Sequence, residues 1–199
     1  RYGSSAASDV YKRQELVRLL KTSNAFVKVL MTKSAQEFIT PLTMQALSGE
    51  KVHTDLLSTE AEAAMGHIEL AKWCDLIVIA PCSANSLSKI AEGRGDDLLS
   101  AVCLATESEI FIAPAMNQAM WKDKRTQKNL SKSIKAGLNI IGPASGEQAC
   151  GDVGDGRMTE PADIVSEVEK TLEKGLLTGK KVIITAGPTQ EMIDPVRYI

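Results

Sequence analysis

Five short apolar runs, separated by stretches with helical periodicity, constrain the fold of this chain more than any other feature of its sequence. The runs are rich in valine and isoleucine. Their apolar residues continue without strict alternation, which is typical of parallel strands covered on both faces. They are Val27–Met31, Leu76–Ala80, Ile110–Ala113, Leu138–Ile141 and Val182–Thr185. Alternation of such strands with helices predicts a doubly wound α/β fold with a parallel sheet.

The stretches between these runs predict helices. Residues 15–21 place leucines on one helical face. Thr40 and Pro41 predict the start of another helix, with threonine as N-cap and proline at the first helical position, and Gly49 predicts its end. The remaining helices are expected over Ile68–Trp73, Leu87–Glu92, Asp97–Ala105, Arg125–Lys135 and Ala162–Lys174.

Composition argues against several classes of function. The 199 residues carry a formal net charge of −2 and no block rich in lysine or arginine, so nucleic acid and acidic membrane surfaces are not expected partners. No apolar run approaches the roughly 20 residues that cross a bilayer. The N-terminal residues also lack the apolar core of a secretory signal. We therefore expect a cytoplasmic protein.

The four cysteines, Cys74, Cys82, Cys103 and Cys150, form no close pair. Because a structural zinc site needs ligands clustered at short spacing, we expect no metal site. Three of the cysteines lie in apolar runs and are expected to be small core residues. Cys150 differs, because glycines and charged residues surround it, and an exposed thiol is a better candidate for chemistry than a buried one.

Both ends of the chain depart from the pattern of a complete α/β domain. Residues 1–14 contain no apolar strand, and we hypothesise that they are a non-native leader that has replaced a first strand and its turn. Residues 15–174 are expected to form the α/β domain, and residues 175–179 a linker. Residues 180–199 contain a strand followed by a tight turn, which predicts the truncated start of a second α/β domain.

Small polar residues follow three of the predicted strands, in the segments Thr32–Ala35, Pro81–Ser86 and Pro114–Asn117. In open α/β sheets, ligands bind at the carboxyl ends of the strands, where hydroxyl and backbone N–H groups suit a phosphate or a polar ring edge. Taken singly, Ser34, Ser83 and Asn117 are more simply explained as helix caps. Together, at one edge of the sheet, they favour a ligand. No GxGxxG or GxxxxGK[ST] motif supports a standard dinucleotide or ATP site.

Two further features are candidates for chemistry. His67 begins a predicted helix, where a lone histidine is usually structural, but near a ligand edge its nearly neutral pKa also suits proton transfer. Residues 146–158 form a glycine-rich loop around Cys150, which is either a mobile flap or a plain surface loop.

These motifs carry a resemblance to a known family. The chain from about Glu15 to Ile199 resembles bacterial bifunctional phosphopantothenoylcysteine decarboxylase/phosphopantothenate–cysteine ligases, whose decarboxylase half belongs to the flavin-containing cysteine decarboxylases. The motifs are Met31–Ala35, Phe38–Thr43, Gly66–Leu70, Pro114–Asn117, Ala149–Asp152 and Gly156–Met158. The segments Ile184–Thr189 and Asp194–Ile199 resemble the opening of the ligase half.

The resemblance implies a flavodoxin-like three-layer sandwich that binds FMN. It implies a carboxy-lyase that converts 4′-phosphopantothenoylcysteine to 4′-phosphopantetheine in coenzyme A synthesis, as part of a trimer or larger homo-oligomer. His67 would be the base or an orienting group, Asn117 would bind the carboxylate end of the substrate, and Cys150 would donate a proton. The residues around FMN would be Thr32, Ser34, Ser83, Ala84, Asn85 and Met116, and the substrate flap would contain Gly151, Asp152, Gly156, Arg157 and Met158. The ligase half would use a nucleoside triphosphate, CTP, with Mg²⁺.

The chemistry explains why a flavin is needed. Loss of CO₂ from an amino acid leaves a carbanion whose charge no side chain absorbs, so a cofactor must act as electron sink. The resemblance implies that FMN oxidises the CH₂–SH group to a thioaldehyde, which accepts the electrons released with CO₂. Hydride then returns from the reduced flavin, and Cys150 supplies the proton.

Three alternatives stay open. A peptidyl-cysteine decarboxylase would share the fold, but the ligase-like C-terminus argues against it. A non-catalytic regulatory flavoprotein subunit would have lost catalytic residues, whereas His67, Asn117 and Cys150 are all present. A flavodoxin-like electron carrier would have no need of the loop around Cys150.

Overall fold

A five-stranded parallel sheet forms the centre of the computed structural model, which describes residues 5–56, 66–147, 153–171, 177, 179–186, 192–194 and 197–198. The strand order is β1-β7-β2-β3-β4, and every neighbouring pair is parallel. The strands are β1 (Phe26–Met31), β2 (Leu76–Cys82), β3 (Glu109–Pro114), β4 (Asn139–Ile140) and β7 (Lys181–Ala186). All five predicted strands are confirmed, with small differences at their ends.

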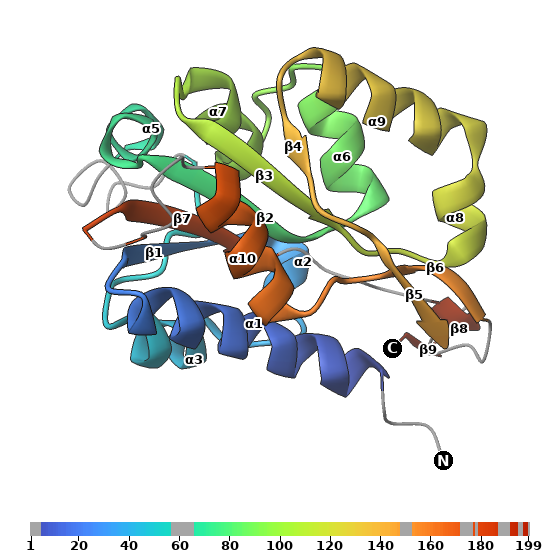
Figure 1. Ribbon diagram of the computed structural model, residues 1–199, viewed down its shortest axis with the longest axis horizontal. Helices are drawn as coiled ribbons and strands as arrows, with labels where there is room; N and C mark the ends of the chain where they lie inside the picture. Colours follow the sequence, from blue (N-terminus) through green and yellow to red (C-terminus); the bar gives the residue numbers. More distant parts are fainter. Residues whose placement is uncertain are drawn as a thin grey trace.

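Helices cover both faces of this sheet and give the three-layer sandwich that the sequence predicts (Figure 1). One layer consists of α1 (Ser5–Thr22), α3 (Pro41–Ser48) and α10 (Pro161–Thr171). The other consists of α5 (His67–Trp73), α6 (Ala84–Ala91), α7 (Leu98–Ala105) and α9 (Lys124–Lys135). Two short helices that the sequence does not predict, α2 (Lys33–Gln36) and α8 (Gln118–Lys122), follow β1 and β3.

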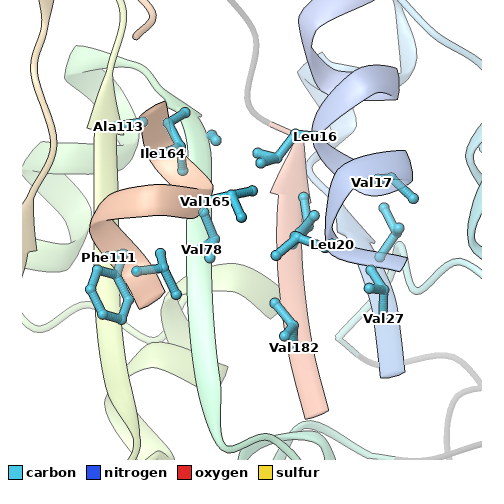
Figure 2. Close-up of a cluster of buried hydrophobic side chains, with 14 of the residues drawn as sticks. Leu16, Val17, Leu20, Val27, Val78, Phe111, Ala113, Ile164, Val165 and Val182 are labelled. Carbon is cyan, nitrogen blue, oxygen red and sulfur yellow. The ribbon is translucent and has the colours of Figure 1, made fainter. Parts of the chain in front are cut away.

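Two hydrophobic cores lie on opposite faces of the sheet. Leu16 of α1 and Ile164 of α10 pack with Val182 of β7 in the first core, which Figure 2 shows in close-up. Leu70 of α5 and Ile183 of β7 belong to the second core. Successive residues of β7 therefore enter different cores, as the side-chain alternation of a strand requires. This continuous burial explains why the apolar runs do not alternate with polar residues.

The caps predicted for α3 are confirmed. The Thr40 hydroxyl accepts a hydrogen bond from the Thr43 backbone N–H at 3.2 Å. Gly49 ends the helix with φ 77°, a left-handed conformation that glycine adopts at little cost. The boundaries of this helix follow from local sequence alone.

Helix α1 begins at Ser5, so the predicted start at Glu15 is wrong. The buried residues Lys12, Leu16 and Leu20 recur at intervals of four and lie on one face of the helix. The stripe that buries the leucines thus continues one turn towards the N-terminus and takes in Lys12. Part of the hypothesised leader therefore folds with the domain.

Strand β7 occupies the middle of the sheet, between β1 and β2. Val182 is in register with Val27 of β1 on one side and with Leu76 of β2 on the other. The strand was predicted, but its place in the sheet of the first domain was not. Its unbroken run of buried valine and isoleucine suits a central parallel strand, which has side chains covered on both faces. A separate antiparallel ribbon joins β8 (Met192–Asp194) to β9 (Arg197–Tyr198).

No helix in the described parts of the chain combines the length and apolar character needed to cross a bilayer.

Candidate functional site at the carboxyl edge of the sheet

The first junction at the carboxyl edge follows β1. Thr32 caps α2, since its hydroxyl accepts a hydrogen bond from the Ala35 backbone N–H at 3.2 Å. Ser34 lies in the first turn of that helix and is exposed. The capping interpretation of Ser34 is therefore wrong, because the cap is Thr32, and the Ser34 hydroxyl is exposed at the strand end.

The second junction follows β2. Ser83 caps α6, and its hydroxyl accepts from the Ser86 backbone N–H at 3.2 Å. Ala84 is partly buried and Asn85 is exposed in the first turn of the helix. This arrangement keeps Ser83 close to the backbone and presents the Asn85 amide at the surface.

The third junction follows β3 and is joined to the second. The Ala115 backbone N–H donates to the carbonyl oxygen of Cys82 at 3.0 Å, so these two strand ends lie side by side. Asn117 caps α8, and its Oδ1 accepts from the Ala119 backbone N–H at 2.8 Å. Met116, next to it, is buried. The structure thus brings Ser83 and Asn117 to neighbouring strand ends, whereas β7 separates Thr32 from them.

An antiparallel hairpin joins this third junction. It consists of β5 (Ala144–Glu147) and β6 (Val153–Arg157), which flank the centre of the glycine-rich loop. The Met116 backbone N–H donates to the carbonyl oxygen of Gly156 at 2.9 Å. Cys150, Gly151 and Asp152 lie outside the described residues. The part of the predicted flap that the structure describes is therefore hydrogen-bonded directly to the Met116–Asn117 turn.

Close packing at Gly154 also joins β6 to α8. A Cβ atom at position 154 would overlap Oε1 of Gln118 and would lie 3.2 Å from its Cδ. Only a residue without a side chain fits between the two elements. Sequence reasoning missed this contact, because nothing local to either residue indicates it.

The side chains that end the hairpin point in different directions. The Arg157 side chain lies beside Gly146 of β5, where an added Cβ would be 2.9 Å from Nη1. Met158 is fully buried in the first core. The core thus holds Met158, and the guanidinium of Arg157 remains over the hairpin.

Lys12 is a further residue that sequence reasoning missed. Its Nζ donates to the carbonyl oxygen of Met158 at 2.9 Å and lies 2.7 Å from Oε1 of Glu160. The four-residue spacing to Leu16, extended backwards, was the signal that would have placed Lys12 on the buried face.

His67 lies apart from these residues in the single chain. It is the first residue of α5, which packs chiefly against α7. Figure 1 shows α5 at the opposite end of the molecule from α8 and the β5–β6 hairpin. The prediction that His67 shares an edge with the three junctions is therefore not met within one copy of the chain.

The described cysteines behave as core residues. Cys74 and Cys82 are buried, and Cys103 packs against the second core. Burial raises the pKa of the Cys82 thiol, and burial followed by the charge of Asp97 raises the pKa of Cys103 to about 12. These thiols stay protonated near neutral pH and are poor nucleophiles. No group of three or more potential metal ligands gathers among the residues described.

Together, the fold and the edge define a doubly wound α/β protein whose ligand site lies at the carboxyl ends of parallel strands. Within that class, the chain belongs to the family described as Flavoprotein, whose model matches residues 2–173. A second family model, described as DNA/pantothenate metabolism flavoprotein C-terminal domain, matches residues 177–199.

Curated relatives match almost the entire chain. The coenzyme A biosynthesis bifunctional protein CoaBC of Vibrio cholerae is 53% identical over 197 residues, which are 99% of this chain and 49% of the relative. The protein of the same name from Escherichia coli K12 is 49% identical over 198 residues, with the same two shares. The chain thus spans about half the length of the curated relatives it matches.

Solved structures agree with the fold. A PPC decarboxylase mutant complexed with pantothenoylaminoethenethiol is 34% identical, with a TM-score of 0.70 over 85% of this chain and 93% of that one. The FMN binding protein AtHal3 is also 34% identical, with a TM-score of 0.68 over 85% and 92%. The peptidyl-cysteine decarboxylase EpiD, at 24% identity and a TM-score of 0.67, shares the fold.

Proposed function

We propose that this chain is the FMN-binding decarboxylase part of a longer protein, and that it converts 4′-phosphopantothenoylcysteine to 4′-phosphopantetheine in coenzyme A synthesis. The observation that carries the proposal is the Met116–Gly156 hydrogen bond, which joins the Pro114–Asn117 turn to the hairpin around Cys150. The similarity to a PPC decarboxylase and to the CoaBC proteins supports the same activity.

The donors at the carboxyl edge fit FMN. Ser34 and Asn85 expose a hydroxyl and an amide in the first turns of α2 and α6. Such neutral donors suit a phosphate and the polar edge of a ring. The residues that would hold FMN are Thr32, Ser34, Ser83, Ala84, Asn85 and Met116. When bound, FMN supplies the reversible uptake of electrons that loss of CO₂ requires.

Asn117 would hold the carboxylate end of the substrate. Its capping bond to Ala119 uses Oδ1 and fixes the plane of the amide, so a carboxylate would be bound through the Nδ2 donor. A hydrogen bond from an amide to a charged carboxylate is stronger than one between neutral groups. Arg157, on the hairpin attached to the same turn, would interact with an anionic group of the substrate.

Proton transfer would involve two residues. Cys150 would donate a proton to the substrate carbon in the reductive step and regain it from solvent. His67 would act as a base or an orienting group. Because α5 lies far from α8 in one chain, His67 would serve the site of a neighbouring subunit, in a homotrimer or a larger homo-oligomer.

The remaining assignments concern the longer protein. Residues 15–174 would form the decarboxylase domain and residues 175–179 the linker. Residues 180–199 would begin a ligase domain that uses CTP and Mg²⁺, an assignment that the second family match supports. Residues 1–14 would be a leader foreign to the natural protein, which sequencing of the intact genomic locus tests. The protein would act in the cytoplasm.

A comparison of two substrates tests the proposed activity. The FMN-loaded protein is incubated with 4′-phosphopantothenoylcysteine or with a peptide that ends in cysteine, and CO₂ and the thiol product are measured. We expect turnover of the first substrate alone. Turnover of the peptide alone would assign the chain to the peptidyl-cysteine decarboxylases, and turnover of neither would contradict enzymatic decarboxylation.

A further inference from the structure

We propose that Lys12 is a positioning residue that fixes the segment containing Arg157 beside the Met116–Asn117 turn. The proposal rests on the function proposed above in one respect, namely that this segment contacts the substrate. It concerns a residue of α1 that belongs to none of the motifs discussed so far.

The contacts of Lys12 are those of a buried connector. Its side chain is only 6% exposed, and its Nζ bonds the Met158 carbonyl oxygen at 2.9 Å and the Glu160 carboxylate at 2.7 Å. An ammonium group removed from water needs such partners, because an unpaired buried charge is strongly destabilising. The paired geometry therefore depends on residues 158–160 staying against α1.

The segment on either side of Arg157 is attached to different parts of the fold. Before it, Gly156 accepts from the Met116 backbone N–H at 2.9 Å. After it, Met158 accepts from Lys12, and the Thr159 hydroxyl donates to the carbonyl oxygen of Ile141 at 3.3 Å. Figure 1 shows the N-terminal part of α1 on the same side of the molecule as β6. The backbone of Arg157 is thus held from two sides.

This arrangement gives Lys12 an indirect role. Its ammonium group is directed to a backbone carbonyl and an acidic side chain, and the carbonyl belongs to the residue next to Arg157. A displacement of Met158 would move the Arg157 guanidinium relative to Asn117. An anionic substrate group bound by both residues would then be held less tightly, while the FMN-binding junctions after β1 and β2 would be unchanged.

Three variants separate this role from a purely structural one. Lys12→Met keeps the apolar stem and removes the donor. Lys12→Arg keeps a donor and a charge. Glu160→Gln is the matched control, because it weakens the exposed ion pair and leaves the bond to the Met158 carbonyl. If Lys12→Met does not fold, Lys12→Gln replaces it, because its amide is polar but too short to span the same distance.

The measurements are hydrogen exchange of the amides of residues 153–160, FMN content, and KM and kcat with 4′-phosphopantothenoylcysteine. For Lys12→Met we expect exchange about tenfold faster, KM raised about tenfold, kcat changed less than twofold and FMN content unchanged. Lys12→Arg and Glu160→Gln should stay within about threefold of the parent protein.

Two results would overturn the proposal. One is unchanged exchange in residues 153–160 of Lys12→Met. The other is a loss of FMN and of kcat together with an unchanged KM, which would assign Lys12 to overall stability. If the parent protein does not turn over the substrate but Lys12→Met still accelerates exchange, the decarboxylase proposal fails and the positioning role of Lys12 is supported.

Discussion

The backbone N–H of Met116 lies 2.9 Å from the carbonyl oxygen of Gly156 and donates a hydrogen bond to it. This bond joins the turn that ends β3 to the strand that follows the glycine-rich loop. A side chain carried by the turn and one carried by the loop can therefore act on the same bound molecule. Catalysis of this kind depends on such fixed relative positions, because small displacements of catalytic groups cost large factors in rate.

Substitution of Asn117 separates its capping role from its role in substrate binding. Aspartate is as good an N-cap as asparagine, so Asn117→Asp should keep the stability of the parent protein within about 0.5 kcal/mol. It replaces the amide donor by a negative charge, which repels a carboxylate. We expect kcat/KM to fall by about 100-fold, corresponding to about 3 kcal/mol at 25 °C. Denaturant unfolding and steady-state kinetics measure the two effects, and an active Asn117→Asp enzyme would exclude carboxylate binding by Asn117.

Gly154 tests the packing of the hairpin on α8. Gly154→Ala introduces a Cβ that overlaps the amide of Gln118, and it should destabilise the protein by about 1–3 kcal/mol, as overpacking commonly does. Gln118→Ala removes the overlapping atoms. In the double variant, the alanine at 154 should therefore cost less than it does alone, a coupling that a double-mutant cycle in urea measures. Strictly additive effects would show that the two residues do not touch in solution.

Cys150 is expected to act in the second half of the reaction. Cys150→Ser should release CO₂ but accumulate an unsaturated thiol in place of 4′-phosphopantetheine, because a serine hydroxyl is a much weaker acid than a thiol. Cys103→Ser is the matched control, since the raised pKa of that thiol keeps it out of proton transfer at neutral pH. Mass spectrometry of the products decides the matter, and normal 4′-phosphopantetheine formation by Cys150→Ser would remove Cys150 from the mechanism.

Much of the fold follows from local sequence. The strand Ile110–Ala113 and the caps at Thr40 and Gly49 were predictable, because apolar runs and capping residues act on their immediate neighbours. At the site, the junctions at Ser83 and Asn117 were predictable, because parallel strands end at the same edge of a sheet.

Other features depend on contacts between distant parts of the chain. The bonds from Met116 to Gly156 and from Lys12 to Met158 leave no periodic signal in the sequence. The place of β7 between β1 and β2 was equally hidden, since an apolar run specifies burial and not which strands it pairs with. His67 was assigned to the ligand edge by its position at a helix start, which does not determine where that helix packs.

The position of β7 can be tested through Thr185. Its side chain is fully buried, and its hydroxyl has no hydrogen-bond partner among the described residues. Thr185→Val has nearly the same shape and removes this unsatisfied group, so it should stabilise the protein by about 1 kcal/mol. Chemical denaturation provides the measurement. A loss of stability would indicate that Thr185 lies in a polar environment and that β7 is not at the centre of this sheet.

The central claim is that flavin-dependent decarboxylation takes place at the carboxyl edge of the sheet. The most direct measurement is CO₂ release from 4′-phosphopantothenoylcysteine labelled in its carboxyl group, by the protein stripped of flavin and by the same protein reconstituted with FMN. We predict a yellow protein after reconstitution, CO₂ in amounts equal to the 4′-phosphopantetheine formed, and no release without FMN. A protein that binds no FMN, or CO₂ release that is independent of FMN, would contradict the account.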